Sequence, residues 1–174
     1  MVLLVLALLT AFAAPRMDVT RYRSDAIGRQ ASTVFAAAAR TAQRERYDVL
    51  VHVDSAGKRI ATLVDRNGNG QLDAGETEVW MALDPGADIL DPPQRLPAVQ
   101  NRLAIRRRGV VSASALSSRD VVFQRRGAAG HDYVLYLTSD PTLPSAWRAV
   151  TVSAQSGAVQ LWRFDGTRWS RGRF

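Results

Sequence analysis

A chain of 174 residues without a single cysteine excludes disulfides, thiolate metal sites and cysteine nucleophiles. Its formal net charge of +7 comes almost entirely from arginine, because Lys58 is the only lysine. An arginine excess spread over the whole chain is weak evidence for a nucleic-acid partner. The length suits one globular domain with a terminal extension.

The first fourteen residues form an uncharged, apolar run that ends before Pro15 and Arg16. A helix that crosses the ~30 Å hydrocarbon core of a bilayer needs about 20 apolar residues, so this run alone is too short. Three interpretations remain open: the membrane-embedded start of a longer helix, a signal peptide, and a buried core helix. The candidate membrane and assembly residues of the first interpretation, which we favour, are Val2, Leu3, Leu4, Val5, Leu6, Leu8, Leu9 and Phe12.

The two alternatives each lack one requirement. A signal peptide could be cleaved after Ala11-Phe12-Ala13, but no basic residue precedes the apolar run. A helix that is apolar on every side would need apolar partners all round, and the rest of the chain is small for that task.

Residues 15–46 have the pattern of an amphipathic helix. Arg21, Asp25 and Arg29 are spaced as an i, i+4 charge ladder on its surface. The predicted buried stripe, which recurs at steps of three and four, consists of Ile27, Ala31, Val34, Ala38 and Ala42.

We predict one long helix from near residue 2 to about residue 46. Residues 1–14 would be its membrane or filament-core part, and residues 15–46 its amphipathic part. Pro15 would bend this helix, and Gly28 would weaken it by about 1 kcal/mol relative to alanine.

From residue 47 the hydrophobic period changes from helical to alternating, as in β-strands. The predicted strands cover residues 48–54, 59–64, 78–83, 103–111, 120–124, 133–138, 147–153 and 158–164. Residues 84–101 contain four prolines, which remove donors and fix φ, so we expect a long surface connection there. One helix followed by an antiparallel sheet over residues 47–174 predicts an α+β fold.

Four sequence features follow one another along the chain, and their order is more informative than any one of them. They are the apolar start leading into an Ala/Arg-rich helix, residues 65–76 before a strand, Phe123-Gln124-Arg125-Arg126-Gly127, and Val150-Thr151-Val152-Ser153 followed by Gly157 and Val159. In this order they resemble the GspH/FimT family, the H-type minor pseudopilins of type II secretion and the related minor pilins of type IV pili.

The resemblance implies a pilin-like fold, in which the second half of the helix packs against the β-rich head. It implies a non-enzymatic structural subunit that assembles through its helix with other pilin or pseudopilin subunits. It also implies a single-pass inner-membrane protein with its head in the periplasm, or outside the cell once taken into a pilus.

Family members begin with a short basic leader, a glycine at the cleavage point and a glutamate at the fifth mature position. None of these residues is present before or within the apolar run. We therefore expect that a leader and about six mature residues precede Met1, since six added to fourteen gives the length of about 20 that a membrane span requires.

The loop from residue 65 to residue 76 matches the calcium-loop template, with Gly70 at position 6. Its candidate oxygen ligands, at positions 1, 3, 5, 9 and 12, are Asp65, Asn67, Asn69, Asp73 and Glu76. The flanking segments are predicted strands rather than EF-hand helices, and Asn-Gly-rich sequences also form ordinary turns. Ca²⁺ is therefore a candidate ligand, and a structural turn is the alternative.

The C-terminal segment alternates arginine with aromatic residues, a composition that can pair with phosphates and stack on bases. Its candidate DNA-binding residues are Arg163, Arg168, Arg171 and Arg173. Some FimT-like members use a basic C-terminal segment to bind DNA during natural transformation, so the resemblance points the same way. The alternative is a solvated, partly frayed tail whose tryptophans cover the end of the sheet.

Catalytic motifs are absent from the sequence. No G-x-S-x-G elbow, phosphate-binding loop or dinucleotide fingerprint occurs, and His52 sits in an alternating strand where a half-buried or surface position is expected. The preferred hypothesis is a minor pilin or pseudopilin. The alternative is an exported β-domain that binds DNA or calcium after cleavage of residues 1–14.

Overall fold

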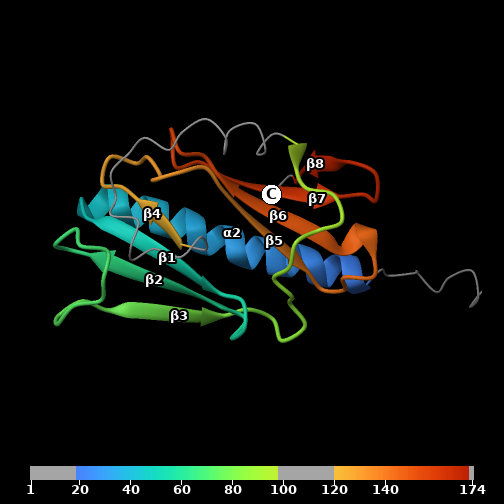
Figure 1. The fold of residues 1–174 in the computed structure, drawn as a ribbon, viewed down its shortest axis with the longest axis horizontal. Helices are drawn as coiled ribbons and strands as arrows, with labels where there is room; N and C mark the ends of the chain where they lie inside the picture. Colours follow the sequence, from blue (N-terminus) through green and yellow to red (C-terminus); the bar gives the residue numbers. More distant parts are fainter. Residues whose placement is uncertain (1–18, 98–119, 173–174) are drawn as a thin grey trace, which may run out of the picture.

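The computed structural model describes residues 19–97 and 120–172, in which one long helix is followed by eight strands (Figure 1). The helix is α2 (Val19–Glu45). The strands are β1 (Asp48–Asp54), β2 (Arg59–Asp65), β3 (Glu78–Ala82), β4 (Asp120–Phe123), β5 (Tyr133–Thr138), β6 (Trp147–Val152), β7 (Val159–Phe164) and β8 (Trp169–Arg171), with a short 3-10 helix, η1 (Pro144–Ala146), before β6. The predicted α+β fold is confirmed.

The strands form two four-stranded antiparallel sheets where the sequence predicted one. Sheet A has the order β3-β2-β1-β4, and sheet B has the order β5-β6-β7-β8. Neighbouring strands in the sequence pair locally into two meanders, and β4 joins the first by returning beside β1. A strand pattern alone does not show where one meander stops, which is why the second sheet was not predicted.

The predicted strand boundaries agree with the structure to within one residue. The exceptions are the segment 103–111, which lies outside the described residues, and β8, which the sequence did not predict because it is only three residues long. Asp165 and Gly166 form the turn before β8, with Gly166 at a φ of 103°. The C-terminal segment is thus part of sheet B up to residue 171.

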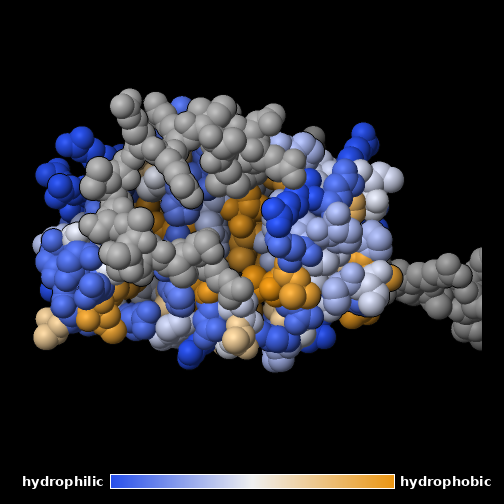
Figure 2. Space-filling model, in the orientation of Figure 1, coloured by the Kyte–Doolittle hydropathy of each residue, from blue (hydrophilic) through white to orange (hydrophobic). Residues whose placement is uncertain are grey.

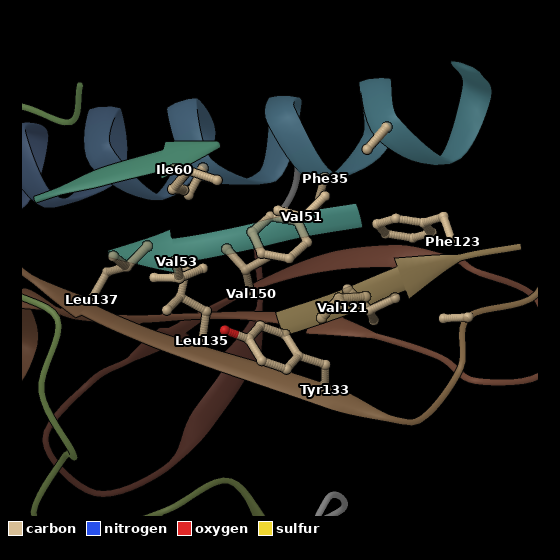
Figure 3. Packing of buried hydrophobic residues seen from close by; sticks show 14 of the residues in the cluster. Phe35, Val51, Val53, Ile60, Val121, Phe123, Tyr133, Leu135, Leu137 and Val150 are labelled. Atoms are coloured by element: carbon tan, nitrogen blue, oxygen red, sulfur yellow. The ribbon is translucent and has the colours of Figure 1, made fainter. Parts of the chain in front are cut away.

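Helix α2 packs on the inner faces of both sheets through the predicted stripe. Ile27, Ala31, Ala38 and Ala42 are buried, and Val34 is partly buried against them. The stripe missed Phe35, which with Phe123 is the largest fully buried side chain among the described residues. Figure 3 shows Phe35 pointing from α2 into the centre of the core, where its ring stacks on Tyr133 at 5.7 Å and meets Phe123 edge-on at 6.4 Å.

Asp25 does not belong to a ladder on the free surface of the helix. Its carboxylate faces sheet B, where it accepts a hydrogen bond from Arg148 Nε at 2.6 Å and pairs with Arg163 Nη2 at 3.0 Å. The Arg148 side chain is only 2% exposed and also donates to the carbonyls of Ser145, Trp147 and Arg21. The predicted ladder is replaced by a buried ion pair because this side of α2 faces β6 and β7.

The connection after β3 lacks strand or helix structure up to residue 96, as its prolines predicted, yet it is anchored. Asp88 and Thr138 exchange backbone hydrogen bonds of 2.8 and 3.0 Å. Leu96 is 2% exposed and donates its N–H to the Tyr136 hydroxyl at 2.9 Å. Burial raises the pKa of that hydroxyl. The connection therefore crosses the outer face of sheet B and covers part of it.

Candidate functional site

The first turns of α2 lie at one end of the head (Figure 1). Val19 and Tyr22 are 69% and 62% exposed there. Polar contacts hold this part of the helix: the hydroxyls of Ser24 and Ser139 lie 2.6 Å apart, and Ser139 donates to the Thr20 carbonyl at 3.0 Å. The apolar residues predicted to enter a membrane, within residues 1–14, lie outside the described residues. Within residues 19–97 and 120–172, no helix has the length and apolar character of a membrane span.

The loop from residue 65 to residue 76 begins at the last residue of β2 and contains all five predicted ligands. Asp65 is 3% exposed, and its two carboxylate oxygens accept hydrogen bonds from the backbone N–H groups of Gly68 and Gly70 at 2.6 and 2.7 Å. Gly68, Gly70 and Gly75 adopt positive φ, which explains the glycines of the motif.

The carboxylates of this loop are already satisfied by N–H donors. Asp73 accepts from the side-chain amides of Asn67, at 2.7 Å, and Asn69. Glu76 accepts from the backbone N–H groups of Arg66 at 2.7 Å and Asp73 at 3.2 Å. The oxygen chemistry suits a hard cation, but both asparagines turn nitrogen atoms toward Asp73. The loop is therefore a turn whose carboxylates are hydrogen-bonded within the loop itself. The described residues contain no group of three or more His, Cys, Asp or Glu side chains placed to hold a metal ion. Calcium binding stays a prediction.

The structure divides the predicted DNA-binding arginines between two faces of sheet B. Arg163 pairs with Ser170 across β7 and β8 and faces α2, where Asp25 binds it. Arg171 pairs with Trp162 on the opposite face and lies over the Trp162 ring at 5.8 Å. Arg168 is 84% exposed beside Asp165, and Arg173 lies outside the described residues. These arginines do not form one continuous surface in the described part of the chain.

The aromatic residues of the same segment pack on the protein itself. Trp169 lies 5.1 Å from the ring of Phe164 and 5.8 Å from Tyr136, and it donates its indole N–H to the Gln94 carbonyl. Trp162 donates to the Thr151 hydroxyl at 3.0 Å. Both tryptophans thus pack on the outer face of sheet B, and DNA binding by this segment stays a prediction.

A His–Asp pair that sequence reasoning missed lies on the outer face of sheet A. His52 Nδ1 is hydrogen-bonded to Asp120, its direct cross-strand neighbour. The pair borders a hollow of about 160 Å³. The hollow is lined by Leu50, His52, Ala61, Leu63, Gly70, Leu72, Glu78 and Asp120. None of these residues offers a hydroxyl or thiol nucleophile, and His52 is 43% exposed, as its place in an alternating strand predicted.

Arginines gather at the other end of the head, where α2 stops. The turn from residue 124 to residue 127 packs there against the helix, since a Cβ on Gly127 would lie 2.4 Å from Gln43 Nε2. Figure 2 shows hydrophilic side chains over this end of the molecule. The exposed arginines of these two segments are Arg40, Arg44, Arg46, Arg125 and Arg126. The sequence showed the charge but not that the two segments meet.

Comparisons with known proteins find similarity at the level of structure. A scan against models of protein families and a search of curated proteins each find no match. Two solved structures of the minor pseudopilin EpsH from the type 2 secretion system of Vibrio cholerae are similar to this chain. One is 14% identical, covers 77% of this chain and 91% of its own, and has a TM-score of 0.48. The other is 11% identical, covers 81% and 96%, and has a TM-score of 0.49. Both are minor pseudopilins, the class of protein that the sequence motifs resemble.

Proposed function

We propose that this protein is a structural minor pilin or pseudopilin subunit. The observation that carries the proposal is the placement of α2. The helix buries one stripe under both sheets along the head, and its first turns reach the end of the head with Val19 and Tyr22 exposed. In the sequence, Val19 follows the apolar run of residues 1–14 after only four residues. A rigid head fixed to one end of a helix that starts apolar is the arrangement that a membrane-held filament subunit requires.

The finer parts of the proposal concern location and partners. The apolar half of the helix would hold the subunit in the inner membrane, with the head in the periplasm, and would then pack against the equivalent helices of other subunits during assembly. In a pilus the head would lie outside the cell. Support comes from the amphipathic continuation of the helix and from its packing, which leaves the side chains of Val19 and Tyr22 exposed.

Fractionation of the native bacterium, followed by mass spectrometry of the mature N-terminus, tests this proposal. We expect the protein in the inner membrane, with a mature start upstream of Met1. Replacing Leu6 with arginine should release the protein from the membrane, because a charge near the centre of a span costs about 2.5–3.5 kcal/mol. The matched control is Val19→Arg, which places the same charge on an exposed position of α2 and should leave the protein membrane-bound.

A soluble periplasmic protein that starts near Ala14 would overturn the proposal in favour of the exported-domain alternative. Assembly is tested separately by cross-linking, because the chain has no native cysteine and a single Leu8→Cys substitution is unique. We expect disulfide-linked products between two copies that carry the substitution, and products with other subunits when a thiol-to-amine cross-linking reagent is used. Gln155→Cys, on an exposed turn of the head, gives the background from random collision.

DNA is a second candidate partner, supported by the exposure of Arg168 and Arg171. In a mobility-shift assay with double-stranded DNA, the double substitution of these two arginines by glutamine should weaken binding if the C-terminal segment is responsible. The same change at Arg125 and Arg126, at the other end of the head, is the matched control. An equal loss in both variants would mean that binding follows net charge alone.

A further inference from the structure

Among the residues that the structure describes, strand β3 forms an open edge of sheet A. It pairs with β2 on one side only, and Figure 1 shows no described strand or helix beyond its other side. Open edges of sheets present unpaired N–H and C=O groups that can bind another extended chain. This edge plays no part in the function proposed above.

The hydrogen-bond pattern identifies which backbone groups of β3 face outward. Leu83 N–H donates to the Lys58 carbonyl at 2.9 Å, so this pair is hydrogen-bonded. In an antiparallel ladder such pairs alternate with pairs that are not hydrogen-bonded. The register therefore directs the N–H and C=O groups of Glu78, Trp80 and Ala82 away from β2. The Gln30 side chain confirms this, because its Nε2 reaches the Ala82 carbonyl from outside at 2.8 Å.

The side chains of β3 leave apolar surface along this open edge. Val79 is 59% exposed and Trp80 is 38% exposed, although both belong to a strand. Proteins usually protect an open edge with lysine, proline or a bulge, and the sequence of β3, Glu-Val-Trp-Met-Ala, contains neither lysine nor proline. Among the described residues, Gln30 caps the Ala82 carbonyl and the Arg59 guanidinium lies 4.1 Å from the centre of the Trp80 ring.

We propose that β3 pairs with β3 of a second copy of this chain, antiparallel and centred on Trp80, so that the two sheets A become one continuous sheet. The occupant follows from the sequence of the strand. In this register Trp80 lies opposite the second copy's Trp80, Val79 opposite Met81, and Glu78 opposite Ala82. Every pair is compatible: two tryptophans, an apolar pair on the face toward α2, and a carboxylate that meets no like charge.

The same register satisfies the outward backbone groups. Trp80 would exchange both hydrogen bonds with its counterpart, and Glu78 would do so with Ala82, while Val79 and Met81 would form the close pair without hydrogen bonds. Gln30 competes with this arrangement, because its amide already occupies the Ala82 carbonyl. The edge is therefore partly capped in the single copy, and removal of the cap should favour pairing.

Register-specific disulfide formation in the full-length chain, purified in mild detergent, tests the proposal. The Cα atoms of a Val79–Met81 pair across the two copies would lie about 4.5 Å apart, within disulfide range. We expect a linked dimer when a Val79→Cys chain is mixed with a Met81→Cys chain. Either variant alone should give little, because Val79 and its own counterpart would be diagonal neighbours roughly 7–8 Å apart. The chain has no native cysteine to interfere.

Controls separate strand pairing from chance contact and from association through the apolar N-terminal run. A mixture of Gln155→Cys and Ser156→Cys chains, both exposed on the turn after β6, measures random collision. Val79 is exposed enough for a lysine there to preserve the fold. We expect sedimentation to detect a dimer of the unmodified chain, which Val79→Lys should abolish and Val79→Ile should retain. Gln30→Ala should increase the yield of linked dimer. Equal yields in mixed and single-variant samples, or a dimer unaffected by Val79→Lys, would overturn the proposal.

Discussion

Different kinds of interaction hold the two halves of α2 against the head. From Ala31 to Ala42 the helix is bound by apolar packing, with Phe35 fully buried between the rings of Phe123 and Tyr133. From Val19 to Gly28 the one buried apolar side chain is Ile27, and the other contacts are polar: the Ser24–Ser139 hydrogen bond, the Arg23–Asp84 ion pair and the buried pair of Asp25 with Arg148. One helix thus has an apolar half and a polar half.

This difference indicates which contacts fix the position of α2 relative to the head. Apolar packing contributes in proportion to the area buried and has no preferred direction, whereas hydrogen bonds and charge-assisted pairs require particular distances and angles and are costly once one buried partner is lost. The apolar half therefore supplies most of the binding energy, and the polar half fixes the axial position of the helix. The polar half is also the part adjoining the segment that we propose enters the membrane.

Removal of the Phe35 ring should have the largest effect. Phe35→Ala would leave a cavity among Phe123, Tyr133 and the surrounding valines, and large-to-small changes of this kind cost about 3–5 kcal/mol. Urea unfolding followed by circular dichroism measures the loss. Thr33→Ala, at an exposed position of the same helix turn, should change stability by less than about 0.5 kcal/mol. Similar costs for the two variants would contradict the assignment of the core to this half.

Breaking the buried ion pair should cost nearly as much. Asp25→Asn keeps the shape of the side chain but leaves the Arg148 guanidinium, which stays charged, without its carboxylate. We expect a loss of about 3 kcal/mol, the low end of the usual range for a buried pair, because three backbone carbonyls still accept from Arg148.

A double substitution separates the roles of the two charges. Asp25→Leu with Arg148→Met removes both, and apolar replacement of a buried pair is often neutral or stabilising. We expect the double variant to be more stable than Asp25→Asn alone, as measured by urea unfolding. If it were less stable, the interactions of Asp25 with both Arg148 and Arg163 would together supply net stability in this half of the helix.

Gly28 marks the junction of the two halves and should show a smaller effect. A Cβ there would lie 2.8 Å from Leu161 Cδ1 and 3.4 Å from Arg148 Cβ, so the neighbours must move. Overpacking costs about 1–3 kcal/mol of stability, and the better helix propensity of alanine offsets about 1 kcal/mol of that cost. Gly28→Ala should therefore destabilise the protein by about 1 kcal/mol in thermal unfolding. Stabilisation would show that Leu161 yields easily and that close packing is not required.

The apolar half was predictable from the sequence, and the polar half was not. Helical spacing identified Ala31, Ala38 and Ala42, and also Ile27 in the polar half, because burial of a stripe follows the period of the helix. It missed Phe35, which extends the stripe sideways toward the second sheet. The partners of Asp25 are more than 120 residues away, and local charge spacing suggested nearer ones.

The candidate sites show the same division between local and distant information. The loop after β2 was recognised from its glycines and oxygen side chains, since the turn chemistry is local. The division of Arg163 and Arg171 between opposite faces of sheet B depends on β8 and its register, and the His52–Asp120 pair depends on β4 returning beside β1. Such pairings connect distant segments, so periodicity does not reveal them.

The smallest effect should come from the exposed ion pair at the start of the polar half. Arg23 Nε donates to Asp84 Oδ1 at 2.8 Å, and both side chains are substantially exposed. The hydrogen bond from Arg23, followed by that from the Gly86 N–H, holds the pKa of Asp84 below its ordinary value. Arg23→Ala should lower the melting temperature slightly at pH 7, by less than Gly28→Ala does.

The pH dependence gives the Arg23 variant its diagnostic value. Because the folded-state pKa of Asp84 is lowered, the ionised carboxylate stabilises the fold above its unfolded pKa of about 3.9, and this contribution disappears as the pH falls through the folded value. The difference in melting temperature between Arg23→Ala and the unmodified protein should therefore shrink below about pH 4 and with added salt. Arg29→Ala, an exposed change on the same helix, should show no such pH trend. A difference that persists in acid would mean that Arg23 acts through packing of its aliphatic stem, and the polar half would then depend on Asp25 and Ser24 alone.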